Sequence, residues 1–121
     1  MLIEERAIRF VQNEERDKNW RRPTRRNNPG FDLYRTDSDT GVTQWCEIKS
    51  LSREFKRVTM TIAEFEKARE CGDSYWLYIV ENIGAQNKDG KAVPAILRIR
   101  NPAGRVRSIS YRHPDWRDLV K

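Results

Sequence analysis

Residues 30–50 have the sequence GFDLYRTDSDTGVTQWCEIKS, in which two alternating segments flank a polar, turn-rich centre. Alternation with a period of two is typical of β-strands, and the Asp, Ser and Gly residues of TDSDTG favour a turn. The alternation places Phe31 and Leu33 opposite Asp32 and Tyr34 in the first segment, and Cys46 and Ile48 opposite Trp45, Glu47 and Lys49 in the second. Residues 30–50 therefore predict a β-hairpin.

The composition of the turn also predicts the register of this hairpin. If the turn centres between Asp39 and Thr40, the numbers of cross-strand partners sum to about 79. Asp32 then lies opposite Glu47, and Lys49 follows two residues later on the same face as Glu47.

Two carboxylates and a lysine at one point of a sheet are the groups that a metal-dependent phosphodiesterase needs. The carboxylates can bind a divalent cation, and the lysine can orient water and offset charge on a phosphate. The competing interpretation is a pair of exposed strand acids, with Lys49 forming a salt bridge to Glu47. Burial separates the two, because carboxylates and a lysine are costly to bury without a counter-ion.

The rest of the chain predicts two helices and two further strands. Residues 2–19 carry an apolar stripe at helical spacing, and Thr61-Ile62-Ala63-Glu64 is a capping box that begins a helix ending near Gly72. Residues 74–80, SYWLYIV, are continuously apolar, as expected of a central strand, and 95–100 predict another strand. Pro114 favours a short terminal helix. This order predicts an α/β (α+β) fold, a mixed central sheet flanked by helices.

The length and net charge of the chain suit a single domain that binds an anionic partner. A chain of 121 residues is the size of a single domain, 1–121, and its net charge of +6 favours nucleic acid, although many ordinary soluble domains are equally basic. Cys46 and Cys71 lack a C-x-x-C spacing or histidine partners, which predicts reduced, buried thiols in a cytoplasmic protein. No apolar run is long enough for a membrane span, and the N-terminal sequence is not that of a signal peptide.

Two basic clusters are candidate nucleic-acid contacts. The first combines an aromatic ring with four arginines, and the second directly follows the Glu-x-Lys segment. They comprise Trp20, Arg21, Arg22, Arg25 and Arg26 in the first cluster and Arg53, Lys56 and Arg57 in the second. The arginines would track phosphates and the tryptophan would stack on a base; a solvated loop is the alternative. His113, the single histidine, suggests no mechanism.

The chain resembles the NO VEIN C-terminal-like domain, a family without an assigned function. The motifs that carry the resemblance are Glu15-Arg16, Gly30-Phe31-Asp32-Leu33, Gly41, Glu47-Ile48-Lys49, Thr61-Ile62-Ala63-Glu64 and Gly72-Asp73-Ser74-Tyr75-Trp76-Leu77-Tyr78. The match runs from about residue 7 to Pro102. Two departures are the basic RRPTRR in place of a first apolar strand, which predicts a short or missing strand, and Ile48 in place of valine.

That family is considered similar to the PD-(D/E)XK nuclease fold, so the resemblance implies a restriction-endonuclease-like core. It implies Mg²⁺, with Mn²⁺ as substitute, bound by Asp32, Glu47, the Ile48 carbonyl and the helical Glu15, and catalysis by Asp32, Glu47, Glu15 and Lys49. Glu14 competes with Glu15 for the helical position, and Glu64 is explained more simply by its capping box.

The implied activity is hydrolysis of DNA phosphodiesters in a restriction or phage-defence setting, beside a helicase or ATPase domain or subunit. The alternatives are a non-catalytic nucleic-acid-binding or assembly module that keeps the fold, and a protein-interaction domain.

Overall fold

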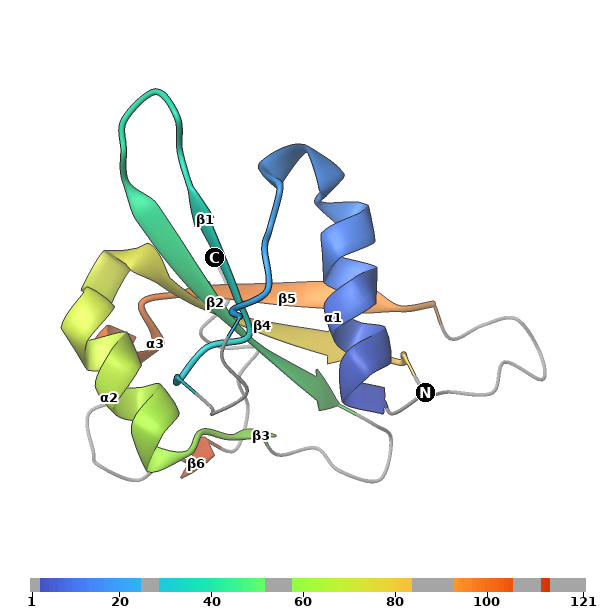
Figure 1. Ribbon diagram of the computed structural model, residues 1–121. Coiled ribbons are helices and arrows are strands. Elements are labelled where there is room, and N and C mark those ends of the chain that lie inside the picture. The colour runs from blue at the N-terminus through green and yellow to red at the C-terminus, as the bar shows by residue number, and fades with distance from the viewer. Residues whose placement is uncertain (1–2, 25–28, 52–57, 84–92, 106–111, 114–121) are drawn as a thin grey trace.

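The computed structural model describes residues 3–24, 29–51, 58–83, 93–105 and 112–113 (Figure 1). Four strands form one mixed sheet in the order β1-β2-β4-β5. Their bounds are Leu33–Thr36 for β1, Thr43–Leu51 for β2, Tyr75–Glu81 for β4 and Ala95–Arg100 for β5. The strand β2 is antiparallel to β1 and parallel to β4, and β5 is antiparallel to β4. The expected α+β fold with a mixed sheet is confirmed, and the apolar strand β4 is central as predicted.

The register of the β1–β2 hairpin follows the turn composition. Leu33 pairs with Cys46 and Tyr34 with Trp45, so partner numbers sum to 79 as expected. The Asp37 carboxylate accepts the backbone N–H of Asp39, which stabilises the turn. One expectation is corrected, because Phe31 packs on the opposite face of the sheet from Leu33.

The reversal at Phe31 has a cause that is distant in sequence. Gly30 has φ +86°, and a Cβ there would lie 2.7 Å from the carbonyl oxygen of Ala63. The chain thus enters β1 in close contact with the second helix, in a conformation that favours glycine.

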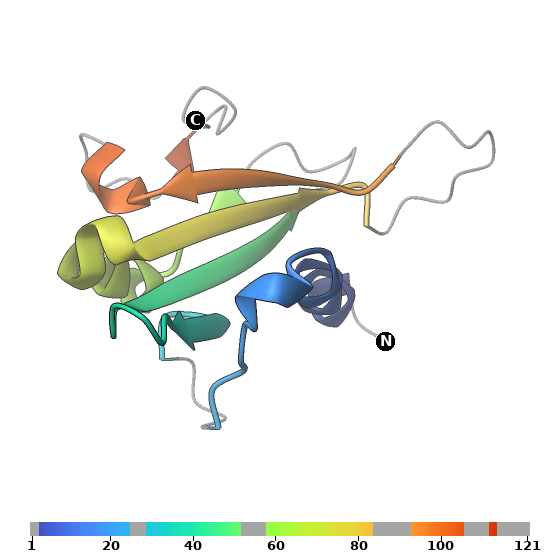
Figure 2. The same ribbon diagram turned by 90° about the horizontal axis from the view of Figure 1, so that it is seen from above.

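The two main helices cover different faces of the sheet. The first, α1, spans Ile3–Glu14 and is followed by the 3₁₀ turn η1, Arg16–Lys18; its buried side chains pack on Cys46 and Ile48. The second, α2, spans Ile62–Cys71, and its Phe65 packs on Leu77. Figure 2 shows α1 along one side of the strands and α2 toward the end at which β4 begins. We call the two sides the α1 face and the α2 face.

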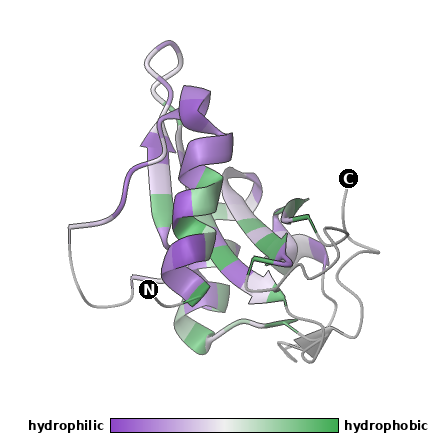
Figure 3. Ribbon diagram, turned by 90° about the vertical axis from the view of Figure 1, so that its right-hand side faces the viewer, coloured by the Kyte–Doolittle hydropathy of each residue, from purple (hydrophilic) through white to green (hydrophobic). Residues whose placement is uncertain are grey.

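Local sequence signals set the limits of these helices. Thr61 and Glu64 form the predicted capping box, and Gly72 ends α2 with φ +54°. The helix α1 stops at Glu14, short of the predicted 19, because η1 turns the chain. In Figure 3 much of the α1 ribbon has the colour of hydrophilic residues, with hydrophobic residues between them. Within the described ranges no helix has the length and apolar character needed to cross a membrane.

Four smaller elements complete the described chain. The 3₁₀ turn η2, Gly72–Ser74, lies directly before β4. A short helix, α3, forms at Pro102–Arg105 after β5, where the sequence predicted only the end of a strand. Strands β3, Val58–Thr59, and β6, Arg112–His113, pair antiparallel and were not predicted. In its described part, residues 21–24, the basic RRPTRR segment contributes one isolated bridge, Arg21 to Tyr34, which fits the expectation of a short or missing first strand. The predicted helix after Pro114 lies outside the described residues.

Candidate functional site

Four charged side chains meet on the α2 face of the sheet, at the end where β1 begins. Glu47 and Lys49 come from β2, Glu64 from the first turn of α2, and Asp32 from the residue before β1. Glu47 and Glu64 are almost fully buried, at 2% and 3% exposure. Charges are buried in proteins only where they are paired or bind an ion. The alternative of a pair of exposed acids therefore does not describe this site.

Lys49 is held by both glutamates, and more closely by Glu64. Its Nζ lies 2.9 Å from Oε1 of Glu64 and 3.8 Å from Oε2 of Glu47. The predicted alternative, a salt bridge from Lys49 to Glu47, is thus present as the longer of two contacts. Because Oε1 of Glu64 also accepts the backbone N–H of Thr61, one carboxylate both caps α2 and positions the lysine.

Asp32 binds to β2 through both its backbone and its side chain. Its backbone N–H donates to the carbonyl of Cys46, and its Oδ2 accepts the backbone N–H of Ile48 at 2.9 and 2.8 Å. The N–H and C=O of a residue in an extended strand point to the same side, so the Ile48 carbonyl also faces the Asp32 side of β2. The structure therefore brings Asp32, Glu47, Lys49 and the Ile48 backbone together.

The pKa values of the two buried glutamates are shifted in opposite directions. Burial, followed by contacts with the carboxyl groups of Glu64 and Asp32, raises the pKa of Glu47 to about 12. Burial also acts to raise the pKa of Glu64, but its hydrogen bonds with Glu47 and Lys49 lower it below the ordinary value. Burial acts to lower the pKa of Lys49, and Glu64 and Glu47 raise it above the ordinary value. In the metal-free protein these shifts favour a proton on Glu47 at pH 7, beside an ionised Glu64 and a protonated Lys49.

One atom of the cluster is unsatisfied. Oε1 of Glu47 is buried and has no hydrogen-bond partner among the described residues. A buried polar oxygen without a partner is unusual and calls for an explanation, such as a bound water, an ion or a catalytic role. No group of three or more His, Cys, Asp or Glu side chains in the described ranges is arranged to hold a metal. A cation here would be bound by two carboxylates, Asp32 and Glu47, with the Ile48 carbonyl as a third oxygen, and such a donor set suits Mg²⁺.

Glu15 does not belong to this cluster, which corrects the expectation that it completes a metal site. It is buried on the α1 face, where it accepts hydrogen bonds from Trp20 Nε1, Tyr78 OH and Arg98 Nε at 2.8, 2.9 and 2.6 Å. Tyr78 belongs to the α1-side core, whereas Glu47 pairs with Leu77 of the α2-side core. The sheet lies between Glu15 and Glu47. The competing candidate, Glu14, is exposed at the end of α1.

The first basic cluster is also corrected in part. Trp20 is buried with its ring against Tyr78, so it offers no surface for a base to stack on. Arg22 forms a two-pronged ion pair with Glu5 at the surface, and Arg21 is exposed. The other candidates, Arg25, Arg26, Arg53, Lys56 and Arg57, lie outside the described residues.

The remaining sequence-level expectations concern the cysteines and Glu64. Cys46 is buried as predicted, whereas Cys71 is half-buried; both are free thiols. For Glu64 the sequence favoured a capping role over a catalytic one, and the structure shows that it caps α2 and also contacts Glu47 and Lys49. The signal for this second role was the Thr-x-x-Glu motif itself, since a glutamate at the third position of a helix points back toward the preceding chain.

Comparisons with known proteins identify a family for this chain but no individual relative. The family described as Protein NO VEIN, C-terminal, matches residues 3–94, which include every member of the α2-face cluster. No curated protein and no solved structure matches the chain. Residues 3–94 are more than half of the 121 residues, and the chain belongs to the NO VEIN C-terminal family.

Proposed function

We propose that this domain is a Mg²⁺-dependent nuclease that hydrolyses DNA phosphodiesters. The observation that carries the proposal is the buried Oε1 of Glu47, which lies beside Asp32 and Lys49 and has no partner in the described part of the chain. An apolar pair of the same size would avoid the cost of burying these charges, so their presence favours a catalytic or metal-binding role. The net charge of +6 supports an anionic substrate.

The residues have separable roles in this proposal. Asp32, Glu47 and the Ile48 carbonyl would hold the cation, which when bound lowers the pKa of a water and offsets charge on the phosphate. The hydrogen bond from the Ile48 N–H to Asp32 fixes the orientation of that carboxylate. Lys49, protonated and held by Glu64, would orient the attacking water and donate to a phosphate oxygen.

Cleavage assays with matched variants test the proposal. The full chain is incubated with single-stranded, double-stranded and supercoiled DNA in Mg²⁺ or Mn²⁺, beside Asp32→Asn, Glu47→Gln and Lys49→Met. Each variant should lose about 100-fold or more in rate. Glu66→Gln, a change at an exposed position of α2, is the control and should cleave like wild type. Circular dichroism establishes that each variant is folded.

Metal binding gives a second readout that does not need the substrate. Mn²⁺ should raise the melting temperature of the wild-type protein and leave that of Glu47→Gln unchanged. Wild-type protein that is inert on every DNA form with both metals, and that shows no Mn²⁺-dependent stabilisation, contradicts the proposal. A restriction or phage-defence setting, with a helicase or ATPase partner, is part of the same proposal and is tested by purifying the protein from its native cells together with any subunits that bind it.

A second candidate is a nucleic-acid-binding or assembly module that keeps the same fold without catalysis. One observation favours it: Lys49 and Asp32 already have partners within the protein, Glu64 and the Ile48 N–H. This candidate predicts salt-dependent DNA binding that Asp32→Asn leaves unchanged. Loss of binding in a charge reversal at Arg25 and Arg26 would map the surface, and absence of any DNA binding would leave a protein-interaction domain.

A further inference from the structure

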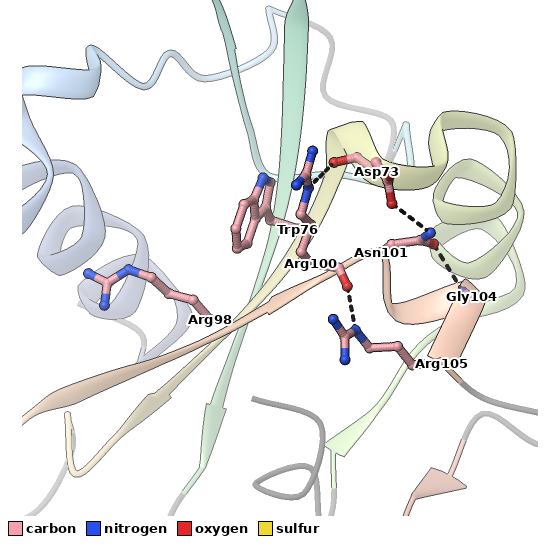
Figure 4. A pocket seen from close by; sticks show the side chains of 7 residues that line it. All are labelled: Asp73, Trp76, Arg98, Arg100, Asn101, Gly104 and Arg105. Atoms are coloured by element: carbon pink, nitrogen blue, oxygen red, sulfur yellow. Dashed lines mark hydrogen bonds between the residues drawn. The ribbon is translucent and has the colours of Figure 1, made fainter. Parts of the chain in front are cut away.

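The core beside the α2-face cluster of charged side chains contains Tyr75, which the proposed mechanism does not use. Tyr75 is the first residue of β4 and is fully buried, with its side chain in the α2-side core. Its neighbour Trp76 points to the opposite face, where it lines a pocket of about 580 Å³ (Figure 4). Tyr75 pairs with Trp45 on β2, and Glu47 follows two residues later on the same face. Tyr75 therefore shares its face of the sheet with the α2-face cluster.

The hydroxyl of Tyr75 binds the chain that leads into Asp32. Its O–H donates to the backbone carbonyl of Gly30 at 2.7 Å, in a buried hydrogen bond between residues 45 positions apart. Gly30 has φ +86° and lies against α2, where a Cβ would be 2.7 Å from the Ala63 carbonyl oxygen. The bend at Gly30 is thus held by two contacts, one with α2 and one with a hydroxyl from the central strand.

The position of Asp32 depends on this bend. Because peptide groups are planar, only the φ and ψ angles of Phe31 separate the peptide that contains the Gly30 carbonyl from the peptide that contains the Asp32 N–H. That N–H donates to the Cys46 carbonyl at 2.9 Å, and Oδ2 of Asp32 accepts the Ile48 N–H at 2.8 Å. A shift of the Gly30 carbonyl is therefore transmitted through one residue to the carboxylate of Asp32.

The Tyr75 hydroxyl is a donor at neutral pH. Burial, followed by the carboxyl groups of Glu47 and Glu64, raises the pKa of Tyr75 well above its ordinary value. The phenol therefore keeps its proton and does not serve as a general base. Because the ring is also fully buried, it does not reach a substrate, and its hydroxyl acts on the site through Gly30.

We propose that Tyr75 is a positioning residue, whose hydroxyl holds the Asp32 carboxylate in the orientation that binds the cation. The inference rests on the proposed function, because the cation is the one that Asp32 and Glu47 would hold. Groups that orient a metal ligand without touching the metal commonly change metal affinity by about 10- to 100-fold. A hydroxyl with a structural role alone would stabilise the fold and leave the metal affinity unchanged.

A matched pair of tyrosines on β4 separates positioning from general stability. Tyr75→Phe removes the hydroxyl that holds Gly30, and Tyr78→Phe removes a buried hydroxyl that donates to Glu15 on the α1 face at 2.9 Å. Both variants should melt at a lower temperature than wild type. Mn²⁺ binding by the full chain is followed by the electron paramagnetic resonance signal of the free ion. It should weaken about tenfold or more in Tyr75→Phe and change by less than about twofold in Tyr78→Phe.

A second measurement needs neither metal nor DNA. Amide hydrogen exchange in EDTA reports on the Ile48 N–H, which donates to Asp32 Oδ2. In Tyr75→Phe the Ile48 amide should exchange faster relative to the hydrogen-bonded amides between β4 and β5. In Tyr78→Phe this ratio should stay at the wild-type value.

A second variant approaches the same hydrogen bond from its acceptor. Gly30→Ala should also weaken Mn²⁺ binding, whereas Gly41→Ala in the hairpin turn should not. Equal Mn²⁺ affinity of Tyr75→Phe and wild type, equal loss in the two tyrosine variants, or an unchanged Ile48 exchange ratio overturns the inference alone. Wild-type protein that binds no Mn²⁺ overturns the proposed function, and the inference with it.

Discussion

Lys49 lies 2.9 Å from Glu64, and the same Glu64 oxygen accepts the backbone N–H that begins α2. The start of a helix and the position of a lysine on the neighbouring strand therefore depend on one carboxylate. This relationship links the local stability of α2 to the chemistry of the α2 face.

Two variants separate the capping role of Glu64 from its charge. Thr61→Ala removes the hydroxyl that accepts from the Glu64 N–H, and should cost about 1 kcal/mol of stability without changing DNA cleavage. Glu64→Gln keeps an oxygen for the Thr61 N–H but removes the charge that holds Lys49, so it should slow cleavage by about tenfold or more. Denaturant unfolding and initial rates measure the two effects. Equal loss of activity in both variants would mean that Glu64 acts through the helix alone.

Glu47→Gln should make the metal-free protein more stable. Burial and the neighbouring carboxyl groups of Glu64 and Asp32 raise the pKa of the Glu47 carboxyl, so this group must take up a proton when the chain folds at pH 7, whereas a glutamine amide is neutral in both states. Removing this cost should stabilise the variant by at least about 1 kcal/mol, since one unit of pKa corresponds to about 1.4 kcal/mol. Differential scanning calorimetry in EDTA should show a higher melting temperature than wild type. Glu66→Gln serves as the surface control, and a lower melting temperature for Glu47→Gln would contradict the placement of Glu47.

Acid should destabilise the protein through Glu15. Burial acts to raise the pKa of Glu15, but hydrogen bonds from Trp20, Arg98 and Tyr78 lower it below the ordinary value of 4.5. A carboxyl whose pKa is depressed in the folded state contributes stability above its unfolded pKa, and that contribution is lost as the pH falls below about 4.5 toward the folded pKa. Glu15→Gln should lose about 1–3 kcal/mol at pH 7 and show a flatter acid limb.

The neighbouring Glu14 provides the control for this measurement. Glu14→Gln changes an exposed side chain and should leave both the stability and its pH dependence near those of wild type. The free energy of unfolding is measured in urea between pH 3 and 7. An acid limb that is as steep in Glu15→Gln as in wild type would show that another group is responsible.

Gly30→Ala should be more damaging than Gly41→Ala, although both glycines have positive φ. A Cβ at Gly30 would lie 2.7 Å from the Ala63 carbonyl oxygen and 2.8 Å from Lys67 Cβ, whereas a Cβ at Gly41 meets nothing within 4 Å. Gly41→Ala carries only backbone strain, about 1 kcal/mol, and Gly30→Ala adds a clash that displaces the chain next to Asp32. Melting temperatures of the two variants measure the difference.

Local signals predicted much of the fold because their causes are local. The turn residues set the register that places Asp32 near Glu47, the capping box begins α2, and the alternation of residues 95–100 gives β5 its observed limits. The convergence of Asp32, Glu47 and Lys49 followed from the same register. Their roles in binding and catalysis stay predictions.

The sequence could not predict features that depend on distant contacts. Phe31 changes face because Gly30 packs against α2, a contact with residues more than thirty positions away. Trp20 is buried by Tyr78, and Glu15 finds its partners on β4 and β5, on a face that helical periodicity does not specify. Periodicity shows which side of a helix is apolar, but the face of the sheet that the helix covers is set by how the whole chain crosses the sheet.

The strict alternation along β2 has a consequence for the evolution of this domain. Cys46 and Ile48 point into the α1-side core, while Glu47 and Lys49 face α2. Inserting or deleting one residue within this strand would exchange the two sets, moving a carboxylate and an ammonium group into a hydrocarbon layer. Changes of length are therefore expected to accumulate in the exposed turn at residues 37–41, and to be absent between residues 43 and 51, when relatives of this chain are aligned.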